Sequence, residues 1–329
     1  MPPNFQWPYT YQISASVQQQ FTKGLVVGIA YVDSLARDLV FGIDLNYPVF
    51  NVANPTANTT TNVNARRPVN MLGSINSQQS RATSNYNAMQ VTFAQRLTHG
   101  ISFKGYYAWT KTMESYGLDS GTIMDYNDLA LEKGPTNTDQ RNIFVTAVVW
   151  QPNYVQENRY MRAAFNGWTI SGIVKLYAGT PYTVNTGVDI NQDGNSPDRA
   201  NQIGNPYDST INHKSRSQAL KRWFDTSAFC TYTLANPSAC PGVGPAFSDS
   251  TSQRNGYIGP GSRDVDLAIL RDFHLFENVK FQLRGEATNV FNFVNLNGPN
   301  GAINIPGTTN QVTSGGQMRQ IQVGARLTF

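Results

Sequence analysis

The 329-residue chain has no long hydrophobic run and few charges. Its longest apolar candidate, Ile143 to Trp150, is interrupted by Thr146, whereas a membrane-spanning helix needs about 18 consecutive apolar residues. Charged residues make up 14% of the chain, against roughly 25% in ordinary soluble domains. Lys and Arg occur in no run longer than pairs such as Arg66-Arg67. These absences exclude a helical membrane protein, and they argue against nucleic acid as a partner.

The chain has only two cysteines, and its amino terminus carries no export signal. Cys230 and Cys240, with nine residues between them in a Pro/Ser/Ala-rich loop, predict a disulfide in an oxidising compartment. Two unpaired thiols are the alternative, since no second Cys pair or His pair completes a zinc site. Met1 to Phe5 lacks a basic segment followed by an apolar one. We therefore expect residues 1–329 to be a fragment of a longer exported protein.

The sequence does contain apolar and polar residues in alternation, most clearly between Gln317 and Phe329. Ile321, Val323, Leu327 and Phe329 alternate there with polar or small residues. A strand of this kind, ending on an aromatic carboxyl-terminal residue, is typical of the closing strand of a transmembrane β-barrel. We expect these four residues to form a carboxyl-terminal signal that binds the barrel-assembly machinery.

The same alternation predicts four further pairs of strands. With the last strand they make nine, and short strands near Leu39 to Asp44 and Gly73 to Gln79 would bring the number to eleven. The predicted fold class is therefore all-β, an antiparallel transmembrane β-barrel wall. The pairs are Tyr9 to Phe21 with Leu25 to Asp33, Asn85 to Leu97 with Ile101 to Thr112, Arg141 to Trp150 with Trp168 to Val184, and Val265 to Phe273 with Val279 to Asn292.

Charges lie on one side of the last predicted hairpin strand. Between Val279 and Asn292, the residues Lys280, Arg284 and Glu286 share one face, and Phe281 and Leu283 share the other. A Lys or Arg that faces lipid at the bilayer midplane costs about 2 to 4 kcal/mol, but little in a hydrated lumen. The charged face is therefore predicted to line a lumen and the apolar face to contact outer-membrane lipid.

Short and long connections alternate along the chain. Short turns such as Lys23-Gly24 are predicted on the periplasmic side, although Gln151 to Gly167 is long for such a turn. The long connections then all fall on the extracellular side: Pro48 to Ser84, Ser115 to Thr138, Asn185 to Gly261, and Phe293 to Gly316.

Large aromatic residues lie near the predicted strand ends. There an amphipathic ring meets both lipid and headgroup, which predicts an interfacial girdle. The alternative is that these rings pack between neighbours. The residues are Trp109, Trp150, Trp168, Tyr177 and Tyr182.

Several motifs follow one another over nearly the whole chain: Ser84 to Gln90, Phe165 to Gly172 with Gly179 to Pro181, Gly259 to Gly261, Glu286 to Asn292, and Arg319 to Gly324. In order and spacing they resemble the carboxyl-terminal half of TonB-dependent outer-membrane receptors. The resemblance is to the Oar-like group, in which a carboxypeptidase-regulatory-like domain precedes the plug.

The resemblance implies a bacterial outer-membrane protein with a 22-stranded barrel, an amino-terminal plug and a TonB box that couples uptake to the proton-motive force. Residues 1–329 contain neither plug nor TonB box, and nine to eleven strands cannot enclose so wide a lumen. We therefore interpret the chain as the carboxyl-terminal part of such a barrel, which alone would insert poorly because its edges are unpaired. The implied partners are outer-membrane lipid, the TonB system through the missing plug, and an unidentified ligand bound by extracellular loops.

One local motif has the spacing of a calcium loop. The segment Asp189 to Gly194 reads D-x-N-x-D-G, and Asp198 stands near the position of the bidentate Glu of an EF-hand, which is missing. This predicts a Ca²⁺ site formed by Asp189, Asn191, Asp193 and Asp198. Successive turns in an extracellular loop are the alternative. No other cofactor is expected.

Catalysis has no support in the sequence, because His99, His213 and His274 are far apart and no phosphate-binding glycine loop is present. We therefore expect no enzyme. Three hypotheses stay open: part of an energy-dependent transporter, a self-sufficient porin-like or structural barrel without TonB coupling, and a soluble all-β protein. The third predicts that outward residues such as Leu283 and Val323 pack against a second sheet.

Overall fold

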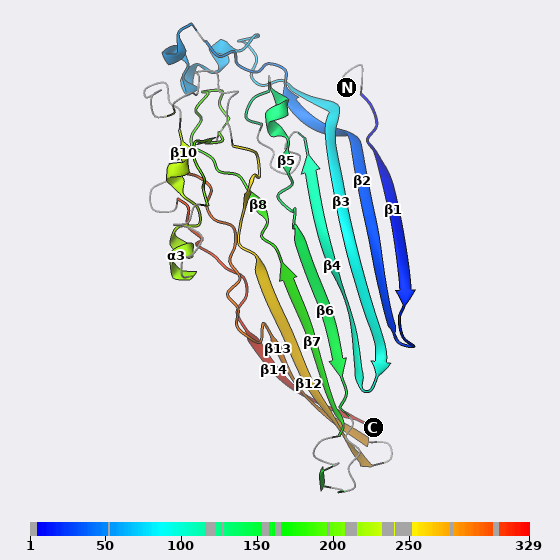
Figure 1. The fold of residues 1–329 in the computed structure, drawn as a ribbon. Helices are drawn as coiled ribbons and strands as arrows, with labels where there is room; N and C mark the ends of the chain where they lie inside the picture. The colour runs from blue at the N-terminus through cyan, green and yellow to red at the C-terminus, as the bar shows by residue number, and fades with distance from the viewer. Residues whose placement is uncertain are drawn as a thin grey trace.

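A computed structural model describes residues 5–51, 53–115, 123–126, 128–152, 158, 160–161, 166–195, 198–207, 216–231, 240, 252–276, 279–304 and 309–329. Its main element is a ten-stranded antiparallel sheet in which each long strand pairs with the next along the chain (Figure 1). The strands, in spatial order, are β1 (Tyr9–Gln20), β2 (Leu25–Asp44), β3 (Asn76–Thr98), β4 (Ile101–Glu114), β6 (Asn142–Trp150), β7 (Trp168–Tyr177), β12 (Ser262–Phe276), β13 (Val279–Thr288) and β14 (Gln320–Thr328), with β5 (Gly134–Pro135) beside β4.

The predicted all-β antiparallel fold is confirmed, with two corrections to its strands. The short strands expected at residues 39–44 and 73–79 are not separate, because β2 and β3 stay paired from Leu25 opposite Gln95 to Asp44 opposite Asn76. The prediction of one strand over residues 168–184 is wrong. Strand β7 ends at Tyr177, and the short β8 (Pro181–Tyr182) pairs instead with β11 (Tyr257–Ile258), since proline has no N–H to continue the ladder.

Short turns gather at one end of the sheet and long connections at the other, as predicted (Figure 1). His99 and Gly100 join β3 to β4 with φ of 52° and 80°, the combination of a two-residue type I′ hairpin. A Cβ atom at Gly100 would collide with the carbonyl oxygen of Gln151, so both conformation and space require glycine there. The turn predicted at residues 275–278 extends beyond the described residues at 277–278.

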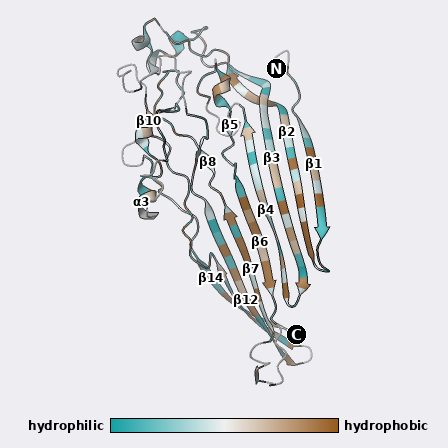
Figure 2. Ribbon diagram, viewed as in Figure 1, coloured by the Kyte–Doolittle hydropathy of each residue, from teal (hydrophilic) through white to brown (hydrophobic). Residues whose placement is uncertain are grey.

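The sheet carries apolar and polar residues in alternation along its strands (Figure 2). Apolar side chains on one face are uncovered: Val17, Ile321 and Val323 are 74%, 68% and 79% exposed. No second sheet packs on this face within the described part of the chain. This finding contradicts the hypothesis of a soluble all-β protein. Among the described residues, no helix has the length and apolar character to cross a membrane.

A second region lies beyond the end of the sheet opposite the short turns (Figure 1). We call it the loop body, and it comprises the described residues of 45–75, 123–141, 178–261 and 289–319. It holds short elements only: β8 and β11, β9 (Asn201–Gln202) paired with β10 (Phe229–Cys230), α3 (Arg216–Lys221), and the 3-10 turns η1 (Pro55–Ala57), η2 (Thr60–Asn62), η3 (Asn64–Arg66), η4 (Leu129–Glu132) and η5 (Thr226–Ala228).

Candidate functional site

Strand register assembles one polar face of the sheet, which we call the lumenal face. Opposed residues in neighbouring strands project to the same side, so a single row can be followed across the sheet. Immediate neighbours along each strand, such as Val17, Val91 and Tyr107, project to the other side. The lumenal row runs through Gln18, Gly28, Thr92, Tyr106, Val145, Lys175 and Asp264.

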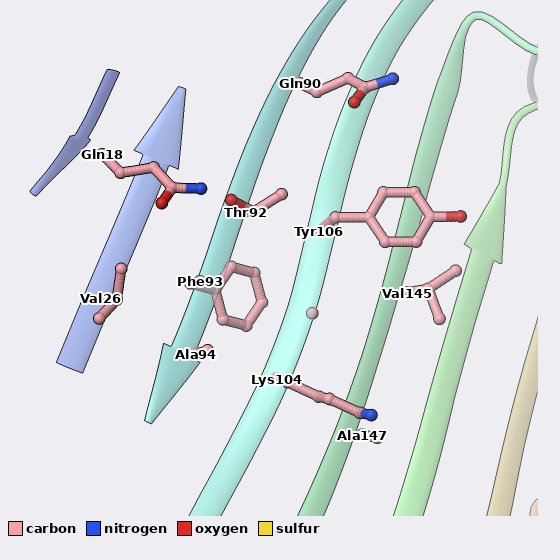
Figure 3. Close-up of a pocket in the computed structure, with 11 residues that line it drawn as sticks. Gln18, Val26, Gln90, Thr92, Phe93, Ala94, Lys104, Tyr106, Val145 and Ala147 are labelled. Atoms are coloured by element: carbon pink, nitrogen blue, oxygen red, sulfur yellow. The ribbon is translucent and has the colours of Figure 1, made fainter. Parts of the chain in front are cut away.

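A groove of about 700 Å³ lies in the lumenal face where β1 to β6 meet (Figure 3). Tyr106 and Lys104 extend from β4 into the same region as the amides of Gln18 and Gln90. Small apolar side chains, Ala94 among them, leave the space between these polar groups open. The other lining residues are Val26, Thr92, Phe93, Gly105, Val145 and Ala147. The groove therefore offers neutral hydrogen-bonding groups, two aromatic rings and a single cation.

The lumenal face changes character toward β14, where charges replace amides. Lys175 Nζ lies 3.1 Å from Asp264 Oδ2 and 2.9 Å from Asp266 Oδ2 across β7 and β12. Arg284 and Glu286 lie 3.5 Å apart on β13. All five of these charges belong to the polar face, as predicted for residues 279–292, but the one-sided distribution does not hold for the whole sheet, because Lys111, Arg263 and Arg271 lie on the outward face. The lumenal face is thus mostly neutral on β1–β6, where Lys104 is the cation of the groove, and more charged on β7–β14.

The loop body has its own aromatic core. Phe224 is fully buried and lies 5.7 Å, centroid to centroid, from Phe229 in an edge-on contact. Its backbone N–H donates to Asn310 Oδ1 at 2.7 Å, and Asn310 Nδ2 donates back to the Phe224 carbonyl. The core also contains Val184, Ala200, Ala228 and Tyr257. The described residues of 178–261 and 289–319 therefore fold together as one packed unit.

Hydrogen bonds join the remaining connections to this unit. Tyr47 Oη donates to Asp193 Oδ2 at 2.7 Å, and burial raises the pKa of Tyr47, so the phenol stays protonated. Asn191 Nδ2 donates to the Met124 carbonyl at 3.1 Å. Asn255 Nδ2 donates to the Pro135 carbonyl at 2.9 Å. Arg66 Nη2, in the first long connection, donates to the Gln192 carbonyl. All four long connections are thus part of the single loop body.

Two buried ion pairs, which sequence reasoning missed, lie where the loop body meets β4, and one of them joins the loop body to that strand. Glu132 Oε1 lies 2.9 Å from Arg199 Nη1, and Glu114 Oε1, at the end of β4, lies 2.8 Å from Arg254 Nη2. Arg254 Nε also donates to the Glu132 carbonyl at 2.8 Å, which links the two pairs. Glu132 has no exposed surface. Glu132 and Arg199 are 67 residues apart in sequence, so no local pattern signals their contact.

The predicted calcium loop is a series of hydrogen-bonded turns. Asp189 accepts the N–H groups of Asp193 and Gly194 at 3.1 and 2.9 Å. Asp198 Oδ2 accepts those of Ile190 and Asn191 at 2.6 and 3.1 Å. Within the described residues, no three His, Cys, Asp or Glu side chains are arranged to hold a metal ion. The contacts have the form of the alternative, successive turns, and the calcium site stays a prediction.

Burial of these carboxylates alters their proton affinity. Burial raises the pKa of Asp198 to about 7, against the lowering effect of the two N–H groups that it accepts. Burial also raises the pKa of Asp193, although its hydrogen bonds with Tyr47 and Asn195 act in the opposite direction. The loop body therefore contains a carboxyl group that titrates near neutral pH.

The two cysteines are bonded in the loop body. The Cα atoms of Cys230 and Cys240 lie 5.5 Å apart, and both residues are buried. Cys230 ends β10, opposite Asn201 in β9. The disulfide therefore links Cys240 to the β9–β10 pair, which adjoins the Phe224 core.

Three of the five predicted girdle residues lie on the outward face. Trp109 is opposite Asn142, and Trp150 is opposite Ile101, so eight residue steps along β4 separate the two levels. That is about 27 Å along the strand and about 21 Å in height at a tilt of about 40°, close to the roughly 25 Å apolar band of such barrels. Trp168, at the start of β7, lies opposite Arg271, whose guanidinium is 4.9 Å from the ring centroid.

The other two predicted girdle residues have different surroundings. Tyr177 is two residues beyond Lys175 in β7, so strand alternation places it on the lumenal face. Tyr182 lies in β8, where its ring packs on the Phe224 core and its hydroxyl is 3.3 Å from that of Tyr207. Their proximity to the predicted strand end suggested the girdle, but that strand ends at Tyr177 and the chain then enters the loop body.

The last strand has the predicted alternation. Ile321, Val323 and Leu327 are opposite Ala287, Gly285 and Phe281 of β13 and are exposed on the outward face. Phe329 follows the strand and is 93% exposed. In the described residues, β14 pairs only with β13, and β1 only with β2, so the sheet is open. Binding of these residues by the assembly machinery stays a prediction.

An amphipathic antiparallel wall with extracellular loops defines the class of outer-membrane β-barrel proteins. A family model described as "Outer membrane beta barrel domain" matches residues 1–322, and the chain belongs to this family. Its location is the bacterial outer membrane.

Three solved structures are similar to the chain at low sequence identity. They are the outer membrane transporter YddB from Escherichia coli (8% identity, TM-score 0.49, covering 99% of this chain and 33% of that one), P. aeruginosa FpvA bound to heterologous pyoverdines (10%, 0.44, 98% and 27%), and the ferric-catecholate import receptor Fiu from E. coli K12 in its closed form (9%, 0.45, 98% and 28%). The chain thus spans a third of their length or less. No curated protein matches the chain.

Proposed function

We propose that the chain is the carboxyl-terminal part of the barrel of a TonB-dependent outer-membrane receptor, of the Oar-like group that its motifs resemble. In this proposal the loop body recognises a ligand outside the cell, and the lumen holds a plug through which TonB drives transport. The single observation that carries the proposal is the union of all four long connections into one packed body at the extracellular end of the lumenal face.

A receptor needs this arrangement more than a passive pore does. A diffusion pore requires an open path, whereas a receptor requires a rigid extracellular surface that is connected to the wall. The Glu114–Arg254 pair supplies such a connection, since it joins the end of β4 to the segment before β11. The open groove of the lumenal face is the surface on which we expect the plug to pack.

Photo-crosslinking in the full-length protein tests the plugged lumen. A benzophenone side chain in place of Tyr106, which lines the groove, should crosslink to the plug segment of the same polypeptide. The matched control is Tyr107, the next residue in β4, which projects to the lipid side and should give no such product. Equal products from both positions, or none from Tyr106, would contradict a plug on this wall.

Conductance distinguishes the receptor from the porin-like alternative. A plugged receptor in a planar bilayer should show no steady conductance, and urea should open it by unfolding the plug while the wall stays folded. A self-sufficient porin should conduct before urea is added. Steady conductance of the untreated full-length protein would therefore refute the proposed function.

A further inference from the structure

A second groove lies on the outward, lipid-facing side of the sheet. It has a volume of about 410 Å³, within the usual range of ligand pockets. Its floor follows one row of the ladder, Tyr31 opposite Met89 and Met89 opposite Trp109, and Ile29 continues it toward the membrane centre. Because Trp109 marks the extracellular level of the apolar band, the groove lies where acyl chains meet headgroups.

The next row toward the loop body supplies polar donors. In this row Asn87 is opposite Lys111, and Lys111 is exposed. Asn87 Oδ1 accepts the hydroxyl of Tyr31 at 2.8 Å, so the NH₂ group of the amide is left to donate outward. Arg141, just before β6, also lines the groove. An apolar floor therefore ends at a set of N–H donors that includes two cations.

The balance of charge around the groove favours an anion beside Lys111. Among the described residues, no carboxylate lies within ion-pair distance of Lys111. Arg141 Nη2 is 3.6 Å from the buried Asp139 Oδ2, while Asp139 Oδ1 accepts the N–H of Thr112. Asp33 occupies the same row as Lys111 but on the far side of Asn87. An anion is therefore expected on the β4–β6 side of the groove.

We propose that this groove binds one phosphorylated lipid of the outer leaflet. An acyl chain lies along Ile29, Met89 and Trp109, and a headgroup phosphate accepts hydrogen bonds from Lys111 and Arg141. Apolar contact along the floor and a cation at headgroup height together meet the requirements of lipid-specific recognition. The binding site does not depend on a plug or on TonB.

Native mass spectrometry of the full-length protein in mild detergent tests this lipid site. The protein is incubated with diphosphoryl lipid A, monophosphoryl lipid A or phosphatidylcholine, and retained lipid is counted for each variant. We expect one retained diphosphoryl lipid A on the native protein and at least tenfold less on the variant Lys111→Gln/Arg141→Gln. Phosphatidylcholine retention should be the same for both proteins.

Two further variants keep the test decisive. Arg263→Gln removes a cation that also faces outward near the extracellular end, on β12 away from the groove, and should change retention less than twofold. Met89→Trp fills the apolar floor and should reduce lipid A retention with both cations present. Unchanged retention in the double variant and in Met89→Trp would overturn the proposal, as would an equal loss in Arg263→Gln, which would indicate binding by charge alone.

Discussion

The wall, which is the ten-stranded sheet, and the loop body of this protein are stabilised by different interactions. In β1 every side chain is exposed, and the buried clusters of the described residues lie in the loop body and at the adjoining ends of β2 and β3. The order of the rest of the wall therefore comes from the backbone ladder that lipid makes obligatory. In the loop body Phe224, Val184 and Glu132 have no exposed surface, and order comes from packing and buried polar contacts. The wall should therefore depend on the polarity of each face, and the loop body on particular contacts.

Loss of one buried charge partner should have the largest effect and should stay within the loop body. Glu132→Ala leaves Arg199 buried without its carboxylate, which costs about 3 to 5 kcal/mol in comparable pairs. Hydrogen exchange should show lost protection in residues 123–141 and 178–207 but not in β1–β3. The double variant Glu132→Met/Arg199→Met removes both charges and should recover most of the protection. Equal loss in wall and loop body would remove the distinction between them.

Acidity should affect the loop body and leave the wall unchanged. The pKa of Asp198 is about 7 in the folded protein, against an ordinary value of 3.8, so the folded state binds the proton more tightly than the unfolded state. This contribution to stability is fully present below about pH 4 and is lost as pH rises through 7. The opening free energy that hydrogen exchange measures in residues 186–195 should fall by a few kcal/mol between pH 4 and pH 8. The variant Asp198→Asn should flatten this dependence on pH. A rise with pH would refute the burial argument.

An arginine introduced on one face or the other of a single strand should show that the two faces of the wall differ in polarity. Val91 and Gln90 are neighbours in β3, and the first projects toward lipid while the second lines the lumenal groove. Val91→Arg should destabilise the inserted protein by about 2 to 4 kcal/mol, and Gln90→Arg by less than about 1 kcal/mol. Urea titration of folding into lipid vesicles measures both. Similar costs for the two variants would mean that the faces are not chemically distinct.

Removal of the disulfide should give the smallest effect of the series and again only in the loop body. The variant Cys230→Ser/Cys240→Ser removes the cross-link that closes a short loop. In chain-entropy accounts a disulfide that closes a loop of this length stabilises the fold by about 2 to 3 kcal/mol. Limited proteolysis should cut residues 231–240 faster, while the wall resists as before. Faster cleavage of β-strand segments would show that the two regions are coupled more strongly than their contacts indicate.

The wall could be predicted from the sequence because its side-chain period of two is local. Alternation in residues 279–288 and 320–328 was enough to predict each strand and its two faces. The loop body could not be predicted in the same way, because its contacts join residues such as Tyr47 and Asp193, 146 positions apart, without any period. The errors at Tyr177 and Tyr182 occur where one region passes into the other, because the predicted strand runs on to Val184 whereas β7 ends at Tyr177.

The most direct test of the lipid face and the lumenal face is the accessibility of spin labels at Val323 and Gln322 in the reconstituted full-length protein. Val323 projects outward and is opposite Gly285, while Gln322 shares the lumenal face with Glu286. We predict that a label at 323 collides mainly with oxygen dissolved in lipid and a label at 322 mainly with a water-soluble nickel chelate. Equal accessibility at both positions would contradict the division of this wall into a lipid face and a lumenal face.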